Sequence, residues 1–164
     1  MHDEILDVVD ADDRVIGSAA RSVVHATGLR HRSAHVLAVD ASGRLFLQRR
    51  AFSKECSPGL WDTSAAGHLA SGEDYVVAAR RELEEELGVT PIGSLDFLFE
   101  LVASADTGQE FVQVFRALVP AEVQPDPVEI IDGRWCDPAD ITTWLLRAPG
   151  DFTGTFRLIW ARLG

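Results

Sequence analysis

A run of glutamates within one predicted helix constrains this chain more strongly than any other part of its sequence. Residues 67–89 read GHLASGEDYVVAARRELEEELGV, and Glu85 and Glu86 follow Glu82 by three and four residues. At about 100° per residue, these three side chains share one stripe of a helix. The adjoining stripe is apolar and is expected to face a sheet; it consists of Val76, Ala79, Leu83 and Leu87. The segment therefore predicts a helix that holds three carboxylates beside the core.

Both ends of this helix carry sequence signals. Ser71, followed three residues later by Asp74, forms a capping-box pattern. Gly88 stands where helices commonly end, because glycine adopts the left-handed conformation that follows the last turn. We therefore expect helix over residues 72–87.

The three glutamates repel one another in the absence of a cation. Like charges four residues apart cost roughly 0.2–0.5 kcal/mol per pair, and glutamates near a helix C-terminus also meet the negative end of the helix dipole. A bound Mg²⁺ or Mn²⁺ would reverse these unfavourable terms, because hard divalent cations take oxygen ligands. Crowding also raises the pKa of at least one carboxyl group. The cluster is interpreted as a metal site, although an acidic helix considered alone also fits a solvated surface.

Composition and charge limit the class of protein. The chain has 164 residues, 46% hydrophobic and 25% charged, which suits one domain over residues 1–164. Its formal charge is −11, with 26 acidic residues against 15 basic ones, so we expect neither a nucleic acid polymer nor a membrane surface as partner. The acidic N-terminus is followed by no long apolar run, and we expect a cytoplasmic protein without a signal peptide. Cys56 and Cys136 stand outside any CxxC pattern and are expected to be reduced.

Short apolar runs alternate with turn signals along the chain, which predicts a mixed α/β domain. The expected strands are residues 5–9, 14–16, 34–39, 45–48, 97–102, 111–119 and 130–136, the first six of them paired in order as three antiparallel hairpins. The expected helices are residues 72–87, 138–146 and 156–163. Three prolines between Pro120 and Pro127 predict a connecting loop there.

An anionic substrate needs local positive charge in so acidic a chain. Arg49 and Arg50 end a predicted strand, and Lys54 follows shortly after them. These three residues are predicted to bind phosphate, although a solubilising role explains any one of them equally well. Trp61, beside a turn at Pro58-Gly59, fits either a core position or a surface that stacks on a base or sugar.

The full pattern of residues 67–89 resembles the signature of the Nudix hydrolases. Every specified position is occupied: Gly67, Glu73, Arg81-Glu82-Leu83, Glu85-Glu86 and Gly88-Val89. The resemblance implies the Nudix fold, an α/β/α sandwich around a mixed β-sheet. It also implies hydrolysis of a nucleoside diphosphate linked to another group.

The same resemblance implies roles for individual residues. Glu82, Glu85, Glu86 and the carbonyl group of Gly67 would hold Mg²⁺, for which Mn²⁺ substitutes. Metal ions of this kind neutralise phosphate oxygens, orient water and stabilise the leaving group.

Other roles implied by the resemblance are supporting ones. Glu73 and Arg81 would form an ion pair that orients the loop against the helix. Glu82 is the first candidate for the general base, and Glu129, just before the strand at residues 130–136, is the alternative. The implied partner is a small-molecule diphosphate, and a homodimer, common among Nudix proteins, is left open.

A second resemblance extends beyond residues 67–89 and covers most of the chain. The segments LRHRSA at residues 29–34, LFLQRR at 45–50 and PGLW at 58–61 look like the Nudix branch that includes the isopentenyl diphosphate isomerases. Those isomerases place a cysteine immediately before the glycine and histidine that are Gly67 and His68 here, and this chain has Ala66. Without that thiol the isomerase reaction lacks an acid/base group, so we favour hydrolysis and keep isomerisation as the alternative.

The isomerase resemblance also implies a divalent metal held by histidines and a glutamate. His25, His31, His68 and Glu110 occupy matching places, with an offset of one residue between the first two. A second metal site is one hypothesis for these residues; separate polar groups satisfied by their neighbours are the other.

A binding module that senses nucleotides without turning them over is a third hypothesis. Such a module is expected to have lost a catalytic carboxylate, whereas Glu82, Glu85 and Glu86 are all present. The signature says nothing about the group attached to the diphosphate, because loops such as residues 103–110 and 120–129 recognise that group.

Overall fold

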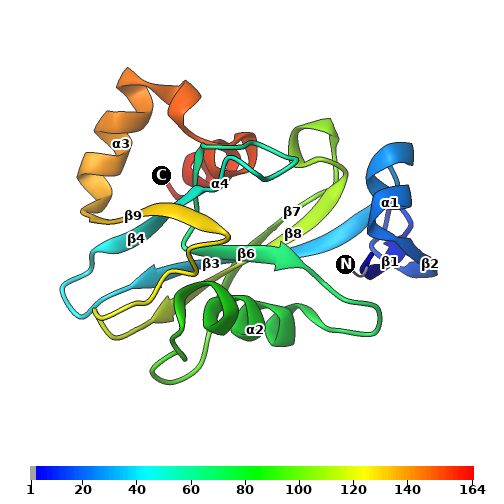
Figure 1. Cartoon of the computed structure of the whole chain (residues 1–164), viewed down its shortest axis with the longest axis horizontal. Helices are drawn as coiled ribbons and strands as arrows, with labels where there is room; N and C mark the ends of the chain where they lie inside the picture. The colour runs from blue at the N-terminus through cyan, green and yellow to red at the C-terminus, as the bar shows by residue number, and fades with distance from the viewer. Residues whose placement is uncertain (1–2) are drawn as a thin grey trace.

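The computed structural model describes residues 3–164 and consists of a mixed sheet between two layers of helices. Helix α2 (Tyr75–Leu87) covers one face, and α3 (Pro138–Arg147) and α4 (Gly154–Leu163) lie over the other (Figure 1). The hairpin of β1 (Ile5–Val9) and β2 (Val15–Ala20) lies at one end with α1 (Arg21–Thr27). The α/β/α sandwich expected from the sequence is confirmed.

The seven strands of the main sheet meet around β3. They are β3 (His31–Val39), β4 (Leu45–Arg50), β5 (Trp61–Asp62), β6 (Ala65–His68), β7 (Asp96–Leu101), β8 (Glu110–Leu118) and β9 (Ile130–Cys136). Strand β3 pairs in parallel with β8 along its whole length and antiparallel with β6. Strand β7 is antiparallel to β8, so the sheet is mixed. Among the described residues β6 pairs with β3 alone, which leaves its other edge free.

Two of the three predicted hairpins are present as expected. The β1–β2 and β7–β8 pairs are antiparallel neighbours. The hairpin predicted for residues 34–39 and 45–48 is wrong in extent, because β3 and β4 share only the pair Val39 and Leu45. Strand β4 then diverges and pairs with β9 and β5. This divergence lets β6 occupy the first half of β3, where the candidate site lies.

Side chains of β3 alternate between two cores, as expected for a strand buried on both faces. Ala34 and Val36 pack with Ala79, Leu83 and Leu87 of α2. The opposite face of β3 contributes Leu37 to the core beneath α3 and α4. The predicted apolar stripe of α2 is therefore confirmed at three positions and wrong at Val76, which is 46% exposed.

The start of α2 differs from the prediction. Asp74 is the N-cap and accepts a hydrogen bond from the backbone N–H of Val77. Ser71 does not cap the helix, because its hydroxyl donates to Asp7 of β1. Gly72 has a φ of +82°, which no helical residue adopts. The predicted end is confirmed, since Gly88 is left-handed and closes the last turn.

Three short elements escaped the sequence analysis: α1, β5 and β6. Helix α1 is short and holds two valines, which favour strands. Strands β5 and β6 have only two and four residues, too few for an alternating pattern. Trp61 of β5 lies in the core against Trp144 at a centroid distance of 5.3 Å, which decides between its two proposed roles.

Two other predictions, the loop before β9 and the unpaired cysteines, agree with the structure. The three-proline stretch forms a connecting loop before β9. Cys56 and Cys136 are free thiols. None of the helices within residues 3–164 has the length and apolar character needed to cross a membrane.

Candidate active site

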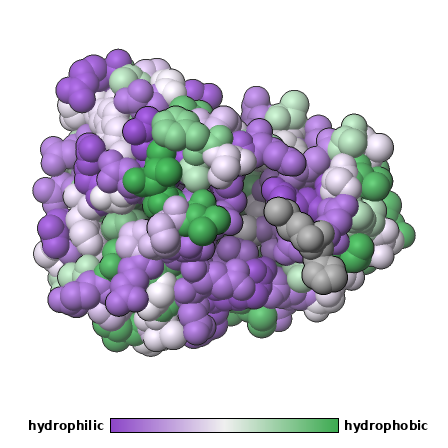
Figure 2. Space-filling view, in the orientation of Figure 1, coloured by the Kyte–Doolittle hydropathy of each residue, from purple (hydrophilic) through white to green (hydrophobic). Residues whose placement is uncertain are grey.

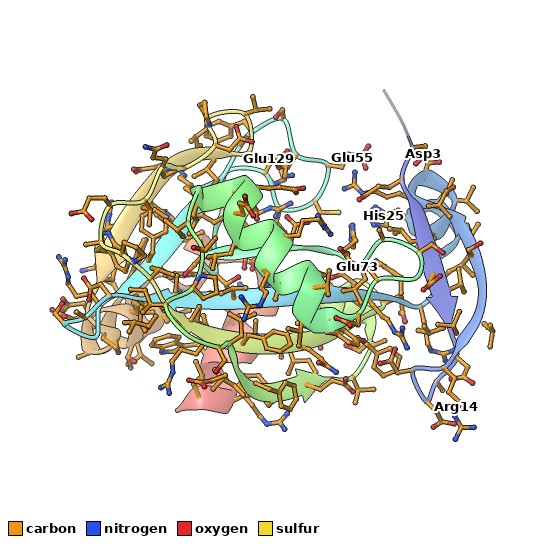
Figure 3. The ribbon with its side chains drawn as sticks, turned by 90° about the horizontal axis from the view of Figure 1, so that it is seen from below. Asp3, Arg14, His25, Glu55, Glu73 and Glu129 are labelled. Atoms are coloured by element: carbon orange, nitrogen blue, oxygen red, sulfur yellow. The ribbon has the colours of Figure 1, made fainter. Side chains whose placement is uncertain are left out.

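A cavity of about 700 Å³ surrounds the end of β6. Two groups of side chains lie at this cavity, which we name the acidic cluster (Glu82, Glu85 and Glu86) and the histidine cluster (His25, His31, His68 and Glu110). All of them line the cavity except His31, which lies behind Glu110 and His68. In Figure 3, which shows α2 in front of the sheet, His25 and Glu129 lie on the same side of this helix. Figure 2 shows mostly hydrophilic residues over α2, as its exposed glutamates and arginines require. The residues predicted from two separate patterns therefore meet around one cavity.

Gly67 lies in direct contact with the acidic cluster. A Cβ atom on this residue would stand 2.1 Å from Oε1 of Glu82, so any other residue would force the Glu82 carboxylate to move. Burial raises the pKa of Glu82 to about 7, against the opposing effect of the neighbouring Arg81 guanidinium. The glycine of the signature thus lets the backbone of β6 approach a half-buried carboxylate.

Glu86 is the most buried member of the acidic cluster, with 7% of its surface exposed. Its carboxylate accepts hydrogen bonds from Nε2 of Gln48 at 3.1 Å and from the backbone N–H of Ala66 at 2.9 Å. Burial, followed by repulsion from Glu82, raises its pKa to about 8. The raised pKa values predicted from crowding are confirmed, and burial is the larger cause.

Arg81 connects the acidic cluster to the loop before α2. Its guanidinium makes two bonds of 2.9 Å to Glu73, which is the ion pair implied by the signature. It also contacts Glu82 at 2.6 Å and Glu85 at 3.2 Å, and donates to the carbonyl oxygen of His68. Because Arg81 holds two of the carboxylates, the three glutamates do not form a compact set of ligands within residues 3–164.

The histidine cluster is compact. One nitrogen from each of His25, His31 and His68 lies within 4.8 Å of the others. Nε2 of His31 and Nε2 of His68 lie 3.5 Å and 3.4 Å from the same oxygen of Glu110. Register explains this convergence, because His31 is paired with Glu110 across β3 and β8, and His68 is paired with Ser33 across β6 and β3.

The nitrogen atoms of the cluster fit a divalent metal. Nδ1 of His31 lies 2.9 Å from the carbonyl oxygen of Leu29, which can only accept, so this nitrogen carries the proton. Nε2 of His31 then presents a lone pair, and among the described residues it is buried without a hydrogen-bond partner. Burial and neighbouring histidines lower the pKa of His25, which favours a neutral ring. Neutral imidazoles with one fixed tautomer are the form that ligates metals.

Glu110 completes this set of candidate ligands. Burial raises the pKa of its carboxyl group, but the neighbouring imidazoles of His31 and His68 outweigh burial and keep the pKa well below its usual range. The group is therefore ionised. Three imidazoles and one carboxylate suit a first-row transition metal better than Mg²⁺, which prefers oxygen ligands alone.

Two of the three predicted phosphate-binding residues line the cavity. Arg50 and Lys54 line it, but Arg49 does not, because consecutive residues of β4 point to opposite faces. The guanidinium of Arg49 donates to the carbonyl oxygen of Gly59 and packs over Phe52, so the structure does not bring Arg49 together with Arg50 and Lys54 at the cavity. Arg21 also lines the cavity and has a buried Nε without a hydrogen-bond partner in residues 3–164. The sequence pointed to no role for Arg21, since it lies in the short helix that was missed.

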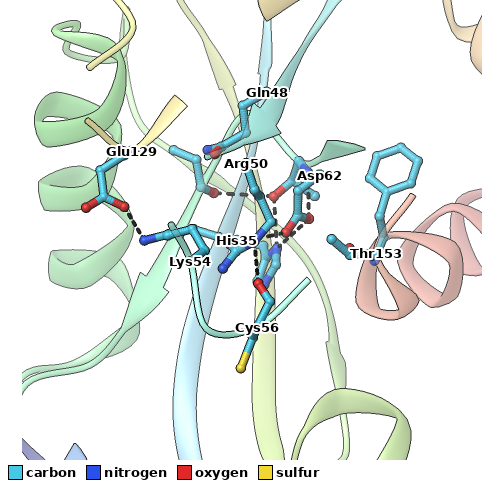
Figure 4. A network of polar contacts seen from close by, with 12 residues as sticks. His35, Gln48, Arg50, Lys54, Cys56, Asp62, Glu129 and Thr153 are labelled. Carbon is cyan, nitrogen blue, oxygen red and sulfur yellow. Dashed lines mark hydrogen bonds and ion pairs between the residues drawn. The ribbon is translucent and has the colours of Figure 1, made fainter. Parts of the chain in front are cut away.

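Lys54 forms an ion pair with Glu129, the alternative general base. Figure 4 shows Arg50 between this pair and Asp62. Nη1 of Arg50 is 3.9 Å from Oδ2 of Asp62, and its Nε donates to the carbonyl oxygen of Cys56. Glu129 is thus balanced by a cation, whereas Glu82 and Glu86 lie deeper with raised pKa values.

Ala66 occupies the place where the isomerases carry their cysteine. Its backbone N–H binds Glu86, and its methyl group shares a face of the sheet with His35, its partner across β3 and β6. An alanine supplies no proton donor or acceptor at this point. The cavity otherwise surrounds this residue with polar groups.

Comparison with known proteins agrees with this geometry. Residues 29–154 match the NUDIX domain family. The chain is 38% identical to an isopentenyl-diphosphate Delta-isomerase of Serratia proteamaculans, over 99% of this chain and 92% of that protein. It is 40% identical to an uncharacterized Nudix hydrolase of Streptomyces coelicolor, over 78% of this chain and 71% of that protein. A crystal structure from Deinococcus radiodurans superposes with a TM-score of 0.82 at 29% identity, covering 97% of this chain and 98% of that one. The chain therefore belongs to the Nudix superfamily, in the branch that includes proteins named isopentenyl-diphosphate isomerases.

Proposed function

We propose that this protein is a divalent-metal-dependent hydrolase that cleaves the diphosphate linkage of a small molecule. The observation that carries the proposal is the pair of carboxylates Glu82 and Glu86, which line the cavity beside Gly67 with pKa values raised to about 7 and about 8. Burying two carboxylates side by side is unfavourable without a cation. Their charge therefore suits a site that a metal ion completes.

Glu82, Glu85, Glu86 and the carbonyl group of Gly67 are the proposed holders of Mg²⁺, with Mn²⁺ as substitute. When bound, the ion supplies charge neutralisation for the phosphate oxygens and lowers the pKa of water. Arg50 and Lys54 contribute positive charge from β4 and the loop after it. Gln48 and the backbone N–H of Ala66 fix the direction of the Glu86 carboxylate.

Glu82 is the proposed general base. Its raised pKa of about 7 suits proton transfer near neutral pH, where a base must be both ionised and basic. Glu129 is the alternative candidate; both carboxylates have a cationic partner, but the side chain of Glu129 is more exposed, at 36% against 13% for Glu82.

Isomerisation of isopentenyl diphosphate is a second candidate function. The compact histidine cluster and the isomerase names of several relatives favour it. Ala66 argues against it, because protonating a carbon double bond needs an acid at that place. We propose that the histidine cluster holds a second metal ion in either case, since the orphaned Nε2 of His31 faces Glu110 there.

Turnover by purified protein, stripped of metal and then supplied with Mg²⁺ or Mn²⁺, tests the proposal. The panel contains nucleoside di- and triphosphates, nucleotide sugars, dinucleotides and isopentenyl diphosphate. Release of phosphate, pyrophosphate or a phosphomonoester is recorded together with double-bond migration. We expect cleavage of the diphosphate linkage in at least one compound, no double-bond migration, and loss of turnover in Glu86→Gln. Glu84→Gln is the matched control, because Glu84 is exposed on the same helix and lies outside the cavity.

Three results would contradict the proposal. Hydrolysis in excess chelator would show that the reaction needs no metal ion. Unchanged turnover in Glu86→Gln would show that Glu86 has no part in catalysis. Tight binding of nucleotides without turnover across the panel would instead support a sensor.

A further inference from the structure

The part of the cavity beyond Ala66 is lined by polar side chains that the proposed hydrolysis does not use. Ser33 and His35 come from β3, Asp62 from β5 and Thr153 from the residue before α4. All four are buried, with no more than 5% of their surface exposed. Ser33 and His35 occupy the face of β3 opposite α2, because they alternate with Ala34 and Val36 along the strand. Asp62 lies beside them, with its Oδ1 3.8 Å from Nδ1 of His35. We name this group the polar pocket.

Ser33 has an unused hydroxyl group. Its Oγ is buried and has no hydrogen-bond partner within residues 3–164. Buried hydroxyl groups are nearly always bonded, and an exception calls for a ligand or water at that point. Ser33 lines the cavity, so its unpaired hydroxyl lies beside the space that a bound molecule would occupy.

His35 presents a hydrogen-bond acceptor. Nδ1 lies 2.9 Å from Oγ1 of Thr63, and the Thr63 hydroxyl has the carbonyl oxygen of Ala65 as its acceptor at 3.4 Å. Thr63 therefore accepts from Nδ1–H of His35, which leaves a lone pair on Nε2. Burial lowers the pKa of His35, in keeping with a neutral ring. The described residues provide no hydrogen bond to this Nε2.

Asp62 has spare acceptor capacity. Oδ1 accepts the backbone N–H of Thr63 at 2.7 Å. Oδ2 has Arg50 as a cation, but at 3.9 Å, which is too long for a hydrogen bond. Buried carboxylates usually accept several close hydrogen bonds, whereas residues 3–164 provide none to Oδ2. Figure 4 shows Asp62 between Arg50 and Thr153, with His35 beside it.

The polar pocket is continuous with the acidic cluster through Ala66. The backbone N–H of this residue binds Glu86, while its methyl group lies on the face that His35 occupies. Arg50 also reaches both parts, since it lines the cavity and approaches Asp62. A molecule whose phosphates lie at the acidic cluster would therefore place its attached group over Ala66 and into the polar pocket.

We propose that the polar pocket binds a hydroxylated group attached to the diphosphate, such as a pentose or hexose, and disfavours a hydrocarbon chain. The inference rests on the proposed function and specifies its substrate class. Hydroxyl groups can donate to His35 Nε2 and Asp62 Oδ2 and bond to the hydroxyl of Ser33. A hydrocarbon chain would leave these buried groups without partners, and sites of this kind discriminate strongly against ligands that lack the hydroxyl. In the hydrolysis of such a diphosphate ester, water adds to one phosphorus atom and the bridging P–O bond breaks. The products are inorganic phosphate and the monophosphate ester.

Ribose 5-diphosphate and isopentenyl diphosphate form a matched pair for the test, because both are five-carbon esters of diphosphate. Calorimetry with Mg²⁺ gives Kd for each ester, and phosphate release gives kcat and KM. We expect Kd to be at least about tenfold lower for the ribose ester. Equal or weaker binding of the ribose ester would overturn the inference, whether or not either ester is hydrolysed.

Ser33→Ala separates ligand binding from protein stability. We expect this substitution to raise Kd and KM for the ribose ester by about fivefold, with kcat, Tm and the Kd of isopentenyl diphosphate unchanged. Ser64→Ala is the control, because Ser64 is a buried serine outside the cavity that bonds the backbone of Ala38 and Phe46. It should lower Tm and leave the ratio of the two Kd values unchanged.

The outcomes distinguish the two proposals. If the ester pair and the wider panel of phosphoanhydrides are all left intact, the proposed hydrolysis fails while the Kd values still test the polar pocket. If phosphate is released but Ser33→Ala leaves the ribose ester unaffected, the polar pocket assignment fails and hydrolysis stands.

Discussion

In metal-free protein, Glu86→Gln is expected to raise the free energy of unfolding, although the same substitution should abolish turnover. Burial raises the pKa of Glu86 from 4.5 to about 8, so the folded protein resists ionisation of this carboxyl group. Between pH 4.5 and about 8 the unfolded chain has lost this proton and the folded protein retains it. Because the unfolded state then binds fewer protons, stability falls as pH rises through this window.

The magnitude follows from the same values. At about 1.4 kcal/mol per pH unit, a pKa change from 4.5 to about 8 gives an upper limit of about 5 kcal/mol. Repulsion by Glu82 is part of the cause and weakens when Glu82 takes up a proton, so we expect about 2–4 kcal/mol at pH 8.5. Glutamine matches the protonated carboxyl group in size, but its amide nitrogen cannot accept one of the two hydrogen bonds that Glu86 receives. The variant should therefore be about 1 kcal/mol less stable than the wild type near pH 5.

Urea unfolding in excess chelator at pH 5, 7 and 8.5 measures the effect. The wild type should lose stability across the series, relative to Glu86→Gln. Saturating Mg²⁺ should then stabilise the wild type more than the variant, because the ion binds the ionised carboxylate. Equal stability of the two proteins at pH 8.5, or a less stable variant at that pH, would refute the electrostatic reasoning.

Three further predictions concern single side chains. Gly67→Ala should reduce kcat/KM by at least about a hundredfold, because its Cβ would overlap the Glu82 carboxylate; wild-type kinetics would show that this contact is not required. Gln48→Leu should raise the Mg²⁺ concentration for half-maximal activity by about tenfold, since Glu86 loses a donor that orients it, and an unchanged metal titration would argue against this role. Leu83→Ala should lower the free energy of unfolding by about 2–5 kcal/mol in denaturant titrations, because this side chain is fully buried under α2; a loss below 1 kcal/mol would indicate that the core repacks.

Local features of the fold could be predicted from the sequence because neighbouring residues determine them. The end of α2 depends on Gly88 and on the apolar side chains within one turn of it. Its start depends on a distant residue, because the hydroxyl of Ser71 donates a hydrogen bond to Asp7 of β1. The four-residue capping pattern cannot show that Ser71 bonds Asp7 instead of capping the helix.

In the candidate site, too, local features could be predicted from the sequence and long-range contacts could not. The spacing of Glu82 and Glu86 placed both on one stripe, and both line the cavity. Their burial could not be inferred from spacing, because Gln48 and the backbone of Ala66 surround Glu86 from strands far away in sequence. A polar residue in the otherwise apolar run LFLQ of β4 was the only signal for Gln48.

The histidine cluster depends wholly on tertiary pairing. His31 and Glu110 meet because β3 and β8 run in parallel, a pairing that no hairpin pattern predicts. Only the resemblance to a known family pointed to these residues together. Arg49 lies outside the cavity for a local reason, because side chains alternate along β4 and those of Arg49 and Arg50 point to opposite faces.

Strand β6 explains how one cavity contains two chemically different clusters. Consecutive residues of a strand point to opposite faces, so Gly67 lies against Glu82 on the side of α2, whereas Ala66 and His68 face the other side. The free edge of β6 lets the backbone N–H of Ala66 bond Glu86 as well. Ala66, Gly67 and His68 thus adjoin the polar pocket, the acidic cluster and the histidine cluster, respectively. The backbone N–H of Ala66 bonds Glu86 while its methyl group faces His35, and an alanine at this point supplies neither an acid nor a base.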